Sequence, residues 1–252
     1  MTLHTIPPPA SPVIRVARGG NGPPTDPFAP PDWERAGVDG TFGNRFDDPG
    51  TGDGVSDAAR FRVVYTATER AGAFAETIAH FRPDLEALAA LAAITGGMGE
   101  HQAIAGVVSE RWRRVRGVGR MLLDPALRFA DVAHPDTLAE LRTVFARLAT
   151  DFGHPDIDLS TVTSGDRRLT QRVARYIYER GIATGMPTFA GVRYISRHGA
   201  AWECWAIFAD RLIGEQLPVQ AIGADDAGLV TAARHFGLTI QPDTQQSPPP
   251  SS

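Results

Sequence analysis

The sequence contains no lysine, so all 25 of its basic residues are arginine. Together with abundant alanine, glycine and proline, this bias is typical of a GC-rich genome rather than of selection for arginine chemistry. Arginine clusters therefore carry little functional weight by themselves. A single cysteine, Cys204, excludes an internal disulfide and a cysteine-based metal cluster and fits a reducing cytoplasm. Because it lies in the aromatic run WECWAIF, we predict a buried structural thiol rather than a nucleophile.

Long hydrophobic runs are also missing. The longest run rich in alanine and leucine, residues 85–94, is interrupted by Glu86 and is too short to span a bilayer. The first residues, MTLHTIPPPASP, lack the basic start and apolar core of a secretion signal. With 42% hydrophobic residues and a net charge of −4, the sequence predicts a cytoplasmic globular protein that does not enter a membrane.

The common short catalytic motifs are absent as well. The sequence has no Walker loop, no zinc-protease helix and no G-x-S-x-G elbow. We interpret His80, His134 and His154 as surface or turn residues, because the histidines lack metal-ligand spacing. Residues 111–120 include five arginines, a candidate contact for nucleic-acid phosphates. The negative net charge and the arginine bias favour a solvated face instead, so nucleic acid is not the expected partner.

The expected domain organisation is simple. Residues 1–12 and 241–252 are rich in proline and serine and are predicted to be disordered. No linker divides residues 61–222, so residues 13–240 are predicted to form a single domain. Residues 19–54 are expected to form a long functional loop, because glycine, proline and aspartate dominate there. Its expected apolar anchors are Phe28, Trp33, Phe42 and Phe46.

The periodicity of apolar residues predicts an α+β fold. Strands are expected at residues 13–17, 61–65, 128–132, 191–196, 202–208 and 218–222, with an edge strand at 238–240. Helices are expected at 83–94, 135–152, 166–180 and 225–236, the second with Leu138, Leu141, Val144, Phe145 and Leu148 inward. Residues 107–123 are compatible with a strand, a turn and a second strand. The order of these elements lacks the regular βαβ alternation of a doubly wound sheet.

The segment 61–78, FRVVYTATERAGAFAETI, predicts a buried strand that leads directly into a short helix. Tyr65 ends the strand, and Thr68 is the expected helix cap. Glu76 lies off the apolar stripe of the helix, beside the small residues Gly72 and Ala73, which leave room for a ligand. Spacing alone leaves open the alternative of a solvated glutamate on an outer face. The stripe consists of Ala71, Phe74, Ala75 and Ile78.

Several dispersed patterns occur in a fixed order. They are GTFGNRFDDP at 40–49, VVYTA and AFAET within 63–77, LTQ at 169–171, and GVRYISRHG at 191–199 before WECWAIF. This order resembles the RES domain family, named for its Arg, Glu and Ser, over about residues 13–210. In the first pattern, many members have GGRWNP where this chain has GNRFDDP, so the contacts of this loop are expected to differ.

The resemblance assigns a role to five positions. Arg45, Tyr65, Glu76 and Ser196 correspond to the family's loop arginine, strand tyrosine, helix glutamate and late serine, and Arg15 to its early arginine. RES proteins are known as NAD-degrading toxins with a fold similar to diphtheria-toxin-like ADP-ribosyltransferases, and their antitoxins are typically Xre-like. The resemblance therefore implies cleavage of the nicotinamide–ribose bond, with NAD as substrate and no separate cofactor or metal.

The chemistry of these residue types suits that reaction. The nicotinamide ring is already cationic, so no general acid must protonate it, and Glu76 is the candidate to oppose the positive charge that grows on the ribose. Arg45 and Arg15 are candidates for the pyrophosphate. Tyr65 is a candidate to stack on nicotinamide or to bind its ribose. Ser196 is a candidate to position the ribose or the attacking water, but not a nucleophile, because no histidine base is recognisable beside it.

The sequence leaves several alternatives open. The acceptor of the ADP-ribosyl group can be water, phosphate or a protein, which correspond to a glycohydrolase, a phosphorylase or an ADP-ribosyltransferase. A non-catalytic, arginine-rich module that binds nucleic acid or protein is the alternative from a different class. Whether an antitoxin binds the chain and whether the chain forms a homodimer also stay open at this point.

Overall fold

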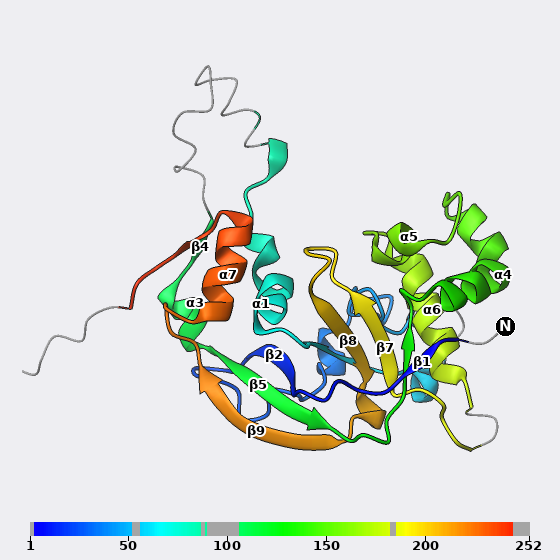
Figure 1. Ribbon diagram of the computed structural model, residues 1–252, viewed down its shortest axis with the longest axis horizontal. Helices are drawn as coiled ribbons and strands as arrows, with labels where there is room; N and C mark the ends of the chain where they lie inside the picture. Colours follow the sequence, from blue (N-terminus) through cyan, green and yellow to red (C-terminus); the bar gives the residue numbers. More distant parts are fainter. Residues whose placement is uncertain (1–2, 52–55, 87–88, 90–105, 182–184, 244–252) are drawn as a thin grey trace, which may run out of the picture.

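The computed structural model describes residues 3–51, 56–86, 89, 106–181 and 185–243 (Figure 1). Its largest feature is a curled sheet of eight strands. In spatial order these are β1 (Thr5–Ile6), β6 (Phe129–Asp131), β7 (Gly191–Ile195), β8 (Glu203–Phe208), β3 (Val63–Ala67), β2 (Val13–Arg18), β5 (Arg116–Leu123) and β9 (Gly214–Ala221). Neighbouring strands are antiparallel except β6 and β7, which are parallel. This mainly antiparallel sheet with separate helices is an α+β fold, as expected.

The helices form two groups on the same side of the sheet (Figure 1). One group consists of α1 (Arg70–Ile78) and α7 (Ala227–Phe236), with the short α3 (Glu110–Arg114) beside them. The other consists of α4 (Pro135–Asp151), α5 (Leu159–Thr163) and α6 (Arg167–Glu179). Each group covers its own apolar cluster, because each helix buries one stripe of side chains against the sheet or a neighbouring helix. Within the described residues, no helix is both long enough and apolar enough to cross a membrane.

Most of the predicted elements are confirmed. Helices α4, α6 and α7 lie within two residues of the expected limits, and β2, β6, β7 and β8 match the expected strands closely. Strand β9 starts four residues earlier than predicted, and β3 is displaced by two residues along the chain. The expected edge strand is β10 (Thr239–Ile240), which pairs in parallel with β4 (Val107–Val108). Most of the helix predicted for residues 83–94 lies outside the described residues.

The long loop divides into two parts with different positions. Its first part lies on the face of the sheet opposite the helices, where Phe28 is 2% exposed and packs with Val13 and Val64. Strand β5 allows this close approach, because a Cβ at Gly119 would lie 2.4 Å from the Pro27 side chain. The later part of the loop, around residues 41–48, reaches the helical side of the sheet, where Gln171 of α6 donates to Thr41 and to the Asn44 carbonyl. The loop is therefore not a single cover over one site.

The predicted disorder of residues 1–12 is wrong for the segment around β1. Thr5 and Ile6 pair with β6 at the edge of the sheet, and Leu3 is 4% exposed in the core beneath α4 and α6. Free backbone groups on an edge strand attract a further strand, even one from a proline-rich segment. Of the tail predicted to be disordered, residues 241–243 are ordered against α3, and residues 244–252 lie outside the described part of the chain.

Residues 107–123, which include the arginine-rich run, form a short strand, β4, and a long strand, β5, as expected, but the turn predicted between them is the helix α3. Ser109 caps α3 by accepting from the Trp112 amide at 3.1 Å, and β5 follows. Arg113 is 2% exposed and binds Asp243 and the carbonyl of Gln241. One arginine of the run is thus part of the packed structure, so the run does not form a continuous basic face for nucleic acid.

The buried face of α4 also differs from the expected one. Val144, predicted to point inward, is 46% exposed, whereas Glu140 is 3% exposed. Glu140 accepts a hydrogen bond from the Tyr176 hydroxyl at 2.6 Å and pairs with Arg180. Because a buried charge needs such partners, this network sets the rotation of the helix instead of hydrophobicity alone. Leu141 is fully buried, as predicted.

Candidate active site

The turn between β3 and α1 places Glu76. Helix α1 begins after Glu69, which makes no side-chain capping bond. The prediction that Thr68 caps this helix is wrong: its hydroxyl donates to Glu203 Oε2 at 2.8 Å and accepts from Trp205 Nε1 at 2.9 Å. Thr68 therefore ties the turn to β8 and sets the position from which α1 starts.

The small residues of α1 have two different functions. A Cβ at Gly72 would lie 3.1 Å from the Trp202 Cβ, so the glycine allows close packing and does not face open space. Ala73, in contrast, lines a cavity. The expectation that both residues line a cleft is correct for Ala73 alone. Phe74 and Ile78 on the opposite side of the helix are fully buried, which orients Glu76 away from the core.

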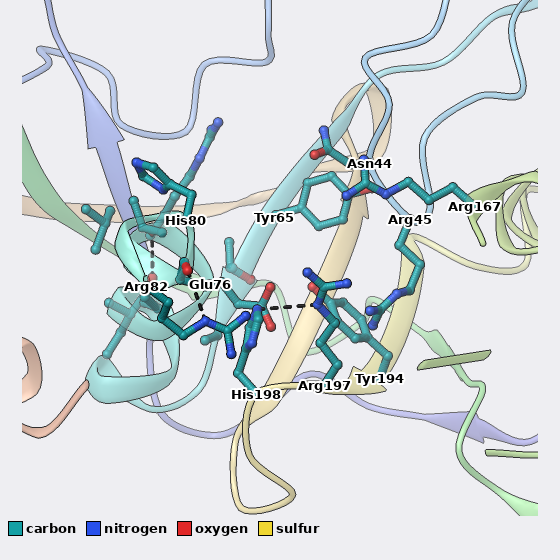
Figure 2. A pocket seen from close by; sticks show the side chains of 18 of the residues that line it. Asn44, Arg45, Tyr65, Glu76, His80, Arg82, Arg167, Tyr194, Arg197 and His198 are labelled. Carbon is teal, nitrogen blue, oxygen red and sulfur yellow. Dashed lines mark hydrogen bonds between the residues drawn. The ribbon is translucent and has the colours of Figure 1, made fainter. Parts of the chain in front are cut away.

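A cavity of about 430 Å³ lies where α1, β2, β3, β7 and the start of α6 meet. Four of the predicted site residues line it, namely Arg15, Arg45, Tyr65 and Glu76. Figure 2 shows Arg82 and His198 beside the Glu76 carboxylate, with Arg45 and Tyr194 across the cavity. Glu76 thus shares a cavity with the residues to which the resemblance couples it. Glu76 is exposed, so it is solvated as the alternative held, but it lies at this cavity rather than on an outer face of the molecule.

Ser196 lies behind Glu76 rather than in the cavity. Its side chain is 3% exposed, and its hydroxyl donates to Glu76 Oε1 at 2.5 Å while accepting from the His198 amide at 3.0 Å. The predicted direct contact of Ser196 with ribose or water is therefore wrong, because the hydroxyl is buried and already used. The serine instead orients the carboxylate. In the described chain, Glu76 Oε2 makes no hydrogen bond, so this oxygen is available to a ligand.

The segment around Arg45 is held on both sides. Phe46 is fully buried, and its amide donates to the Tyr65 hydroxyl at 2.9 Å. That hydroxyl donates in turn to Asp47 Oδ1 at 2.9 Å, and Asp47 Oδ2 accepts from the Asn44 amide at 2.6 Å. Because the residues before and after Arg45 are fixed, its side chain is presented to the cavity from a rigid loop.

Two further residues explain other parts of the sequence patterns. Gln171, from the LTQ pattern, donates to the Asn44 carbonyl at 3.0 Å and to Thr41 Oγ1 at 3.1 Å. Asp48 pairs with Arg175 at 2.7 Å and accepts from the Phe61 amide at 3.2 Å. Asp47 and Asp48, which stand where the common family pattern has a single asparagine, are thus both used to hold this loop.

Tyr65 contributes its ring to the cavity and its hydroxyl to the loop. Burial raises the pKa of Tyr65 well above its ordinary value of 10, and the adjacent Asp47 carboxylate acts in the same direction. The phenol therefore stays protonated and keeps its bond to Asp47. Tyr65 is predicted either to stack on nicotinamide or to bind its ribose. Its hydroxyl is already used by Phe46 and Asp47, so the remaining role is contact of the ring with nicotinamide.

The cavity has a strong excess of positive charge. In the described part of the chain, its only acidic side chain is Glu76, and none of its arginines forms an ion pair with a carboxylate. Burial lowers the pKa of Arg15 to about 10 and also lowers that of Arg45. Such unpaired, partly desolvated guanidinium groups favour an anionic ligand. The arginines are Arg45, Arg82, Arg167 and Arg197; Arg15 also lines the cavity, but its guanidinium lies on the other face of β2.

Arg45 and Arg15 are each held by a backbone carbonyl. Arg45 Nη2 donates to the Thr163 carbonyl at 3.0 Å, and its guanidinium carbon lies 5.6 Å from the centre of the Tyr194 ring. The Arg15 side chain lies between those of Ile14 and Val16 on β2, which face the helices, so it points to the opposite face, where Nη1 donates to the Ala29 carbonyl at 2.9 Å. The neutral partner orients Arg45 without cancelling its charge, which leaves its other N–H groups for an anion, whereas the guanidinium of Arg15 lies on the far face of the sheet from the helices.

The comparison with protein families agrees with this arrangement. The model of the RES domain matches residues 15–225. The chain belongs to the RES domain family. No curated protein and no solved structure matches the chain. The specific likeness of this RES domain to the diphtheria-toxin-like fold thus stays a prediction.

Sequence reasoning missed several residues of the RES cavity. Arg197 and His198 lie inside the GVRYISRHG pattern, and Arg167 immediately precedes RLTQ. Their closeness to these patterns in the sequence could have indicated that they belong to the site. Arg82 had no such signal. His80, interpreted as a surface or turn residue, is exposed and also lines the cavity.

The single cysteine has the structural role predicted for it. Cys204 is fully buried opposite Tyr194 in the β7–β8 pair. Burial raises the pKa of the Cys204 thiol well above its ordinary value. A thiol that stays protonated in the core is a poor nucleophile.

Proposed function

We propose that this RES protein cleaves NAD at the bond between nicotinamide and ribose, with water as the acceptor. One observation carries the proposal: a single carboxylate, held by a buried serine, faces a cavity whose arginines lack acidic partners. NAD presents the complementary groups, since it combines an anionic pyrophosphate with a ribose that becomes positively charged as nicotinamide leaves. The family match supports a protein that acts on NAD.

Glu76 supplies the stabilisation of charge. The nicotinamide ring is already cationic, so no acid has to protonate the leaving group. As the bond breaks, positive charge grows on the ribose, and a fixed carboxylate beside it lowers the energy of that state. Ser196 holds Oε1 at 2.5 Å, which directs the unbonded Oε2 toward a ribose hydroxyl. A preoriented carboxylate does not have to reorganise during the reaction.

The arginines bind the pyrophosphate. Their planar guanidinium groups make paired, charge-assisted hydrogen bonds with phosphate oxygens. We assign Arg45 to this role, because it lines the cavity and is oriented by a carbonyl. The predicted contact of Arg15 with the pyrophosphate is not part of this proposal, because its guanidinium bonds Ala29 on the opposite face of the sheet. The rings of Tyr65 and Tyr194 line the space between Arg45 and Glu76 and provide apolar surface for the nicotinamide.

The biological role that we propose follows from the family. RES proteins are known as toxins paired with Xre-like antitoxins, and we extend this role to the present chain. The antitoxin would then be an Xre-like protein whose binding prevents the consumption of NAD. Coexpression with the protein encoded by the adjacent gene should relieve growth arrest if this assignment is correct.

The purified protein is expected to release one nicotinamide for each NAD consumed, with free ADP-ribose as the second product. Chromatography of the reaction in phosphate-free buffer measures both products. Formation of ADP-ribose 1-phosphate only when phosphate is added would identify a phosphorylase. Labelled ADP-ribose bound to a protein would identify a transferase. Absence of nicotinamide from a reaction with folded protein would contradict the proposed function.

Replacing Ser196 with alanine is expected to lower kcat by about 10-fold or more, because a hydrogen bond to a charged group contributes about 1.5–3 kcal/mol. KM should change little, since the hydroxyl is buried and does not reach the substrate. Ser196→Thr, which keeps the hydroxyl, is expected to retain more activity. Initial rates over a range of NAD concentrations separate kcat from KM. An increase in KM without loss of kcat would instead place Ser196 in direct contact with NAD.

A further inference from the structure

His198 shares a hydrogen-bond network with Glu76. Its backbone N–H donates to the Ser196 hydroxyl at 3.0 Å, and the same hydroxyl donates to Glu76. One buried serine therefore sets the positions of the carboxylate and of the histidine. The imidazole of His198 lines the cavity beside Glu76 (Figure 2).

The ring of His198 is oriented by contacts on two sides. Phe236 of α7 contacts it edge to face, with ring centres 5.5 Å apart and an interplanar angle of 88°. Arg197 Nε lies 3.5 Å from His198 Nε2 and points its N–H toward that nitrogen. Because an arginine only donates, Nε2 carries the lone pair and the ring proton lies on Nδ1.

The charged groups around the ring keep it neutral. Burial lowers the pKa of His198 below its ordinary value of 6.5, and the positive charges of Arg197, Arg82 and Arg45 act in the same direction. Glu76 acts in the opposite direction and does not reverse the shift. These groups come from four segments: the loop after β7, the turn after α1, the loop around residues 44–48, and α1. At neutral pH, His198 therefore keeps a lone pair on Nε2, whose contact with Arg197 Nε at 3.5 Å is long and weak enough for an attacking water to replace it.

Glu76 is poorly suited to accept a proton itself. Its negative charge is needed as the ribose becomes positive, and protonation during the attack would remove that charge at the wrong moment. The attacking water nevertheless loses a proton as its oxygen bonds to the ribose. The arginines of the cavity cannot accept this proton, and of the two histidines in the described chain that line the cavity, His198 rather than His80 lies beside Glu76 (Figure 2).

We propose that His198 is the general base of the hydrolysis, accepting through Nε2 the proton of the attacking water. In this step the water oxygen forms a bond with C1′ of the ribose. The C1′–N bond breaks, and its electron pair leaves with neutral nicotinamide. The proton passes to His198 and then to solvent, so the products are ADP-ribose, nicotinamide and one proton. This assignment rests on the proposed function.

The test compares water with a nucleophile that has no proton to lose. His198→Ala is expected to lower kcat for hydrolysis in phosphate-free buffer by about 10²-fold, the usual contribution of a general base, with KM within about twofold of wild type. Sodium azide should restore nicotinamide release in this variant, with ADP-ribosyl azide as the product, because the azide anion attacks without a base. His198→Asn should lose hydrolysis to a similar extent if the alanine variant folds poorly.

The pH dependence gives a second measurement. Wild-type kcat should fall as the pH drops through the lowered pKa of His198, because the protonated ring cannot accept a proton. In His198→Ala this acid limb should disappear. The matched control is His235→Ala. His235 is exposed, contacts Trp202 and Phe236, and does not line the cavity, so its variant should keep wild-type rates.

The outcomes separate this proposal from the proposed function. If wild type releases no nicotinamide, the proposed function fails. If wild type is active and His198→Ala loses hydrolysis but azide does not restore nicotinamide release, His198 has a structural role and the proposal is overturned. Unchanged hydrolysis and an unchanged pH profile in folded His198→Ala would also overturn it.

Discussion

Glu76→Gln is expected to lower kcat for nicotinamide release by about 10³-fold, because removing a fixed electrostatic partner of the transition state typically costs 10²–10³-fold. KM should stay within about threefold of wild type. Glutamine has nearly the same shape, and its side-chain carbonyl can still accept the hydrogen bond that Ser196 donates to Glu76 Oε1. The change therefore removes charge and leaves the geometry of the cavity largely intact. Initial rates of nicotinamide release at saturating NAD measure the effect.

A control on the same helix is available. Glu69 precedes α1, is exposed and makes no capping bond, and it does not line the cavity. Glu69→Gln removes the same charge close to the site and should keep wild-type kcat. Circular dichroism and thermal unfolding show whether each variant is folded. A folded Glu76→Gln protein with wild-type activity would refute the catalytic role of this carboxylate.

Arg45→Ala is expected to raise KM for NAD by about 10- to 100-fold, because charge-assisted hydrogen bonds contribute about 1.5–3 kcal/mol each. Its effect on kcat should be small, about threefold, since the pyrophosphate is bound equally before and during bond cleavage. The loop itself should persist, because Phe46, Asp47 and Gln171 hold it without the arginine side chain. Arg45→Lys should lie between wild type and Arg45→Ala, because lysine keeps the charge but lacks the planar fork.

The control for Arg45 is an arginine with no role in the cavity. Arg147 lies on α4 with a side chain 97% exposed, and Arg147→Ala should leave both kinetic constants unchanged. Initial-rate measurements over a wide range of NAD concentrations determine kcat and KM separately. If Arg45→Ala lowered kcat as strongly as it raised KM, the separation between binding by Arg45 and catalysis by Glu76 would be wrong.

Most helices and strands could be predicted from the sequence, because the signals that begin and end them are local. Helix α4 begins with Pro135 at its first turn, and α6 begins after Asp166, whose side chain accepts from the Arg168 amide at 3.0 Å. Such signals involve residues a few positions apart. The exceptions had distant causes. Residues Thr5 and Ile6 are ordered by pairing with β6, about 125 positions away in the chain, and no local pattern reports such a partner.

Some residues of the site could also be predicted from the sequence, whereas others depend on contacts between distant segments. The order of the patterns was sufficient to select Arg45, Tyr65 and Glu76, since a family's residues recur in a fixed order along the chain. The role of Ser196 could not be predicted, because it depends on a hydrogen bond to a residue 120 positions earlier. The importance of the arginines could not be predicted either. The composition gives no reason to assign a function to one arginine rather than another. In the folded chain, Arg70 pairs with Asp226, whereas the cavity arginines have no acidic partner among the described residues.

The sequence by itself determined the α+β class, the limits of most helices and strands, and the family. These properties follow from short-range periodicity, capping residues and the order of patterns along the chain. Only the tertiary structure decided that Ser196 supports Glu76 from behind, that the Tyr65 hydroxyl holds the Arg45 loop, and that His198 stands beside the carboxylate. The physical reason is that burial, unpaired charge and side-chain hydrogen bonds arise between segments that meet only when the chain folds.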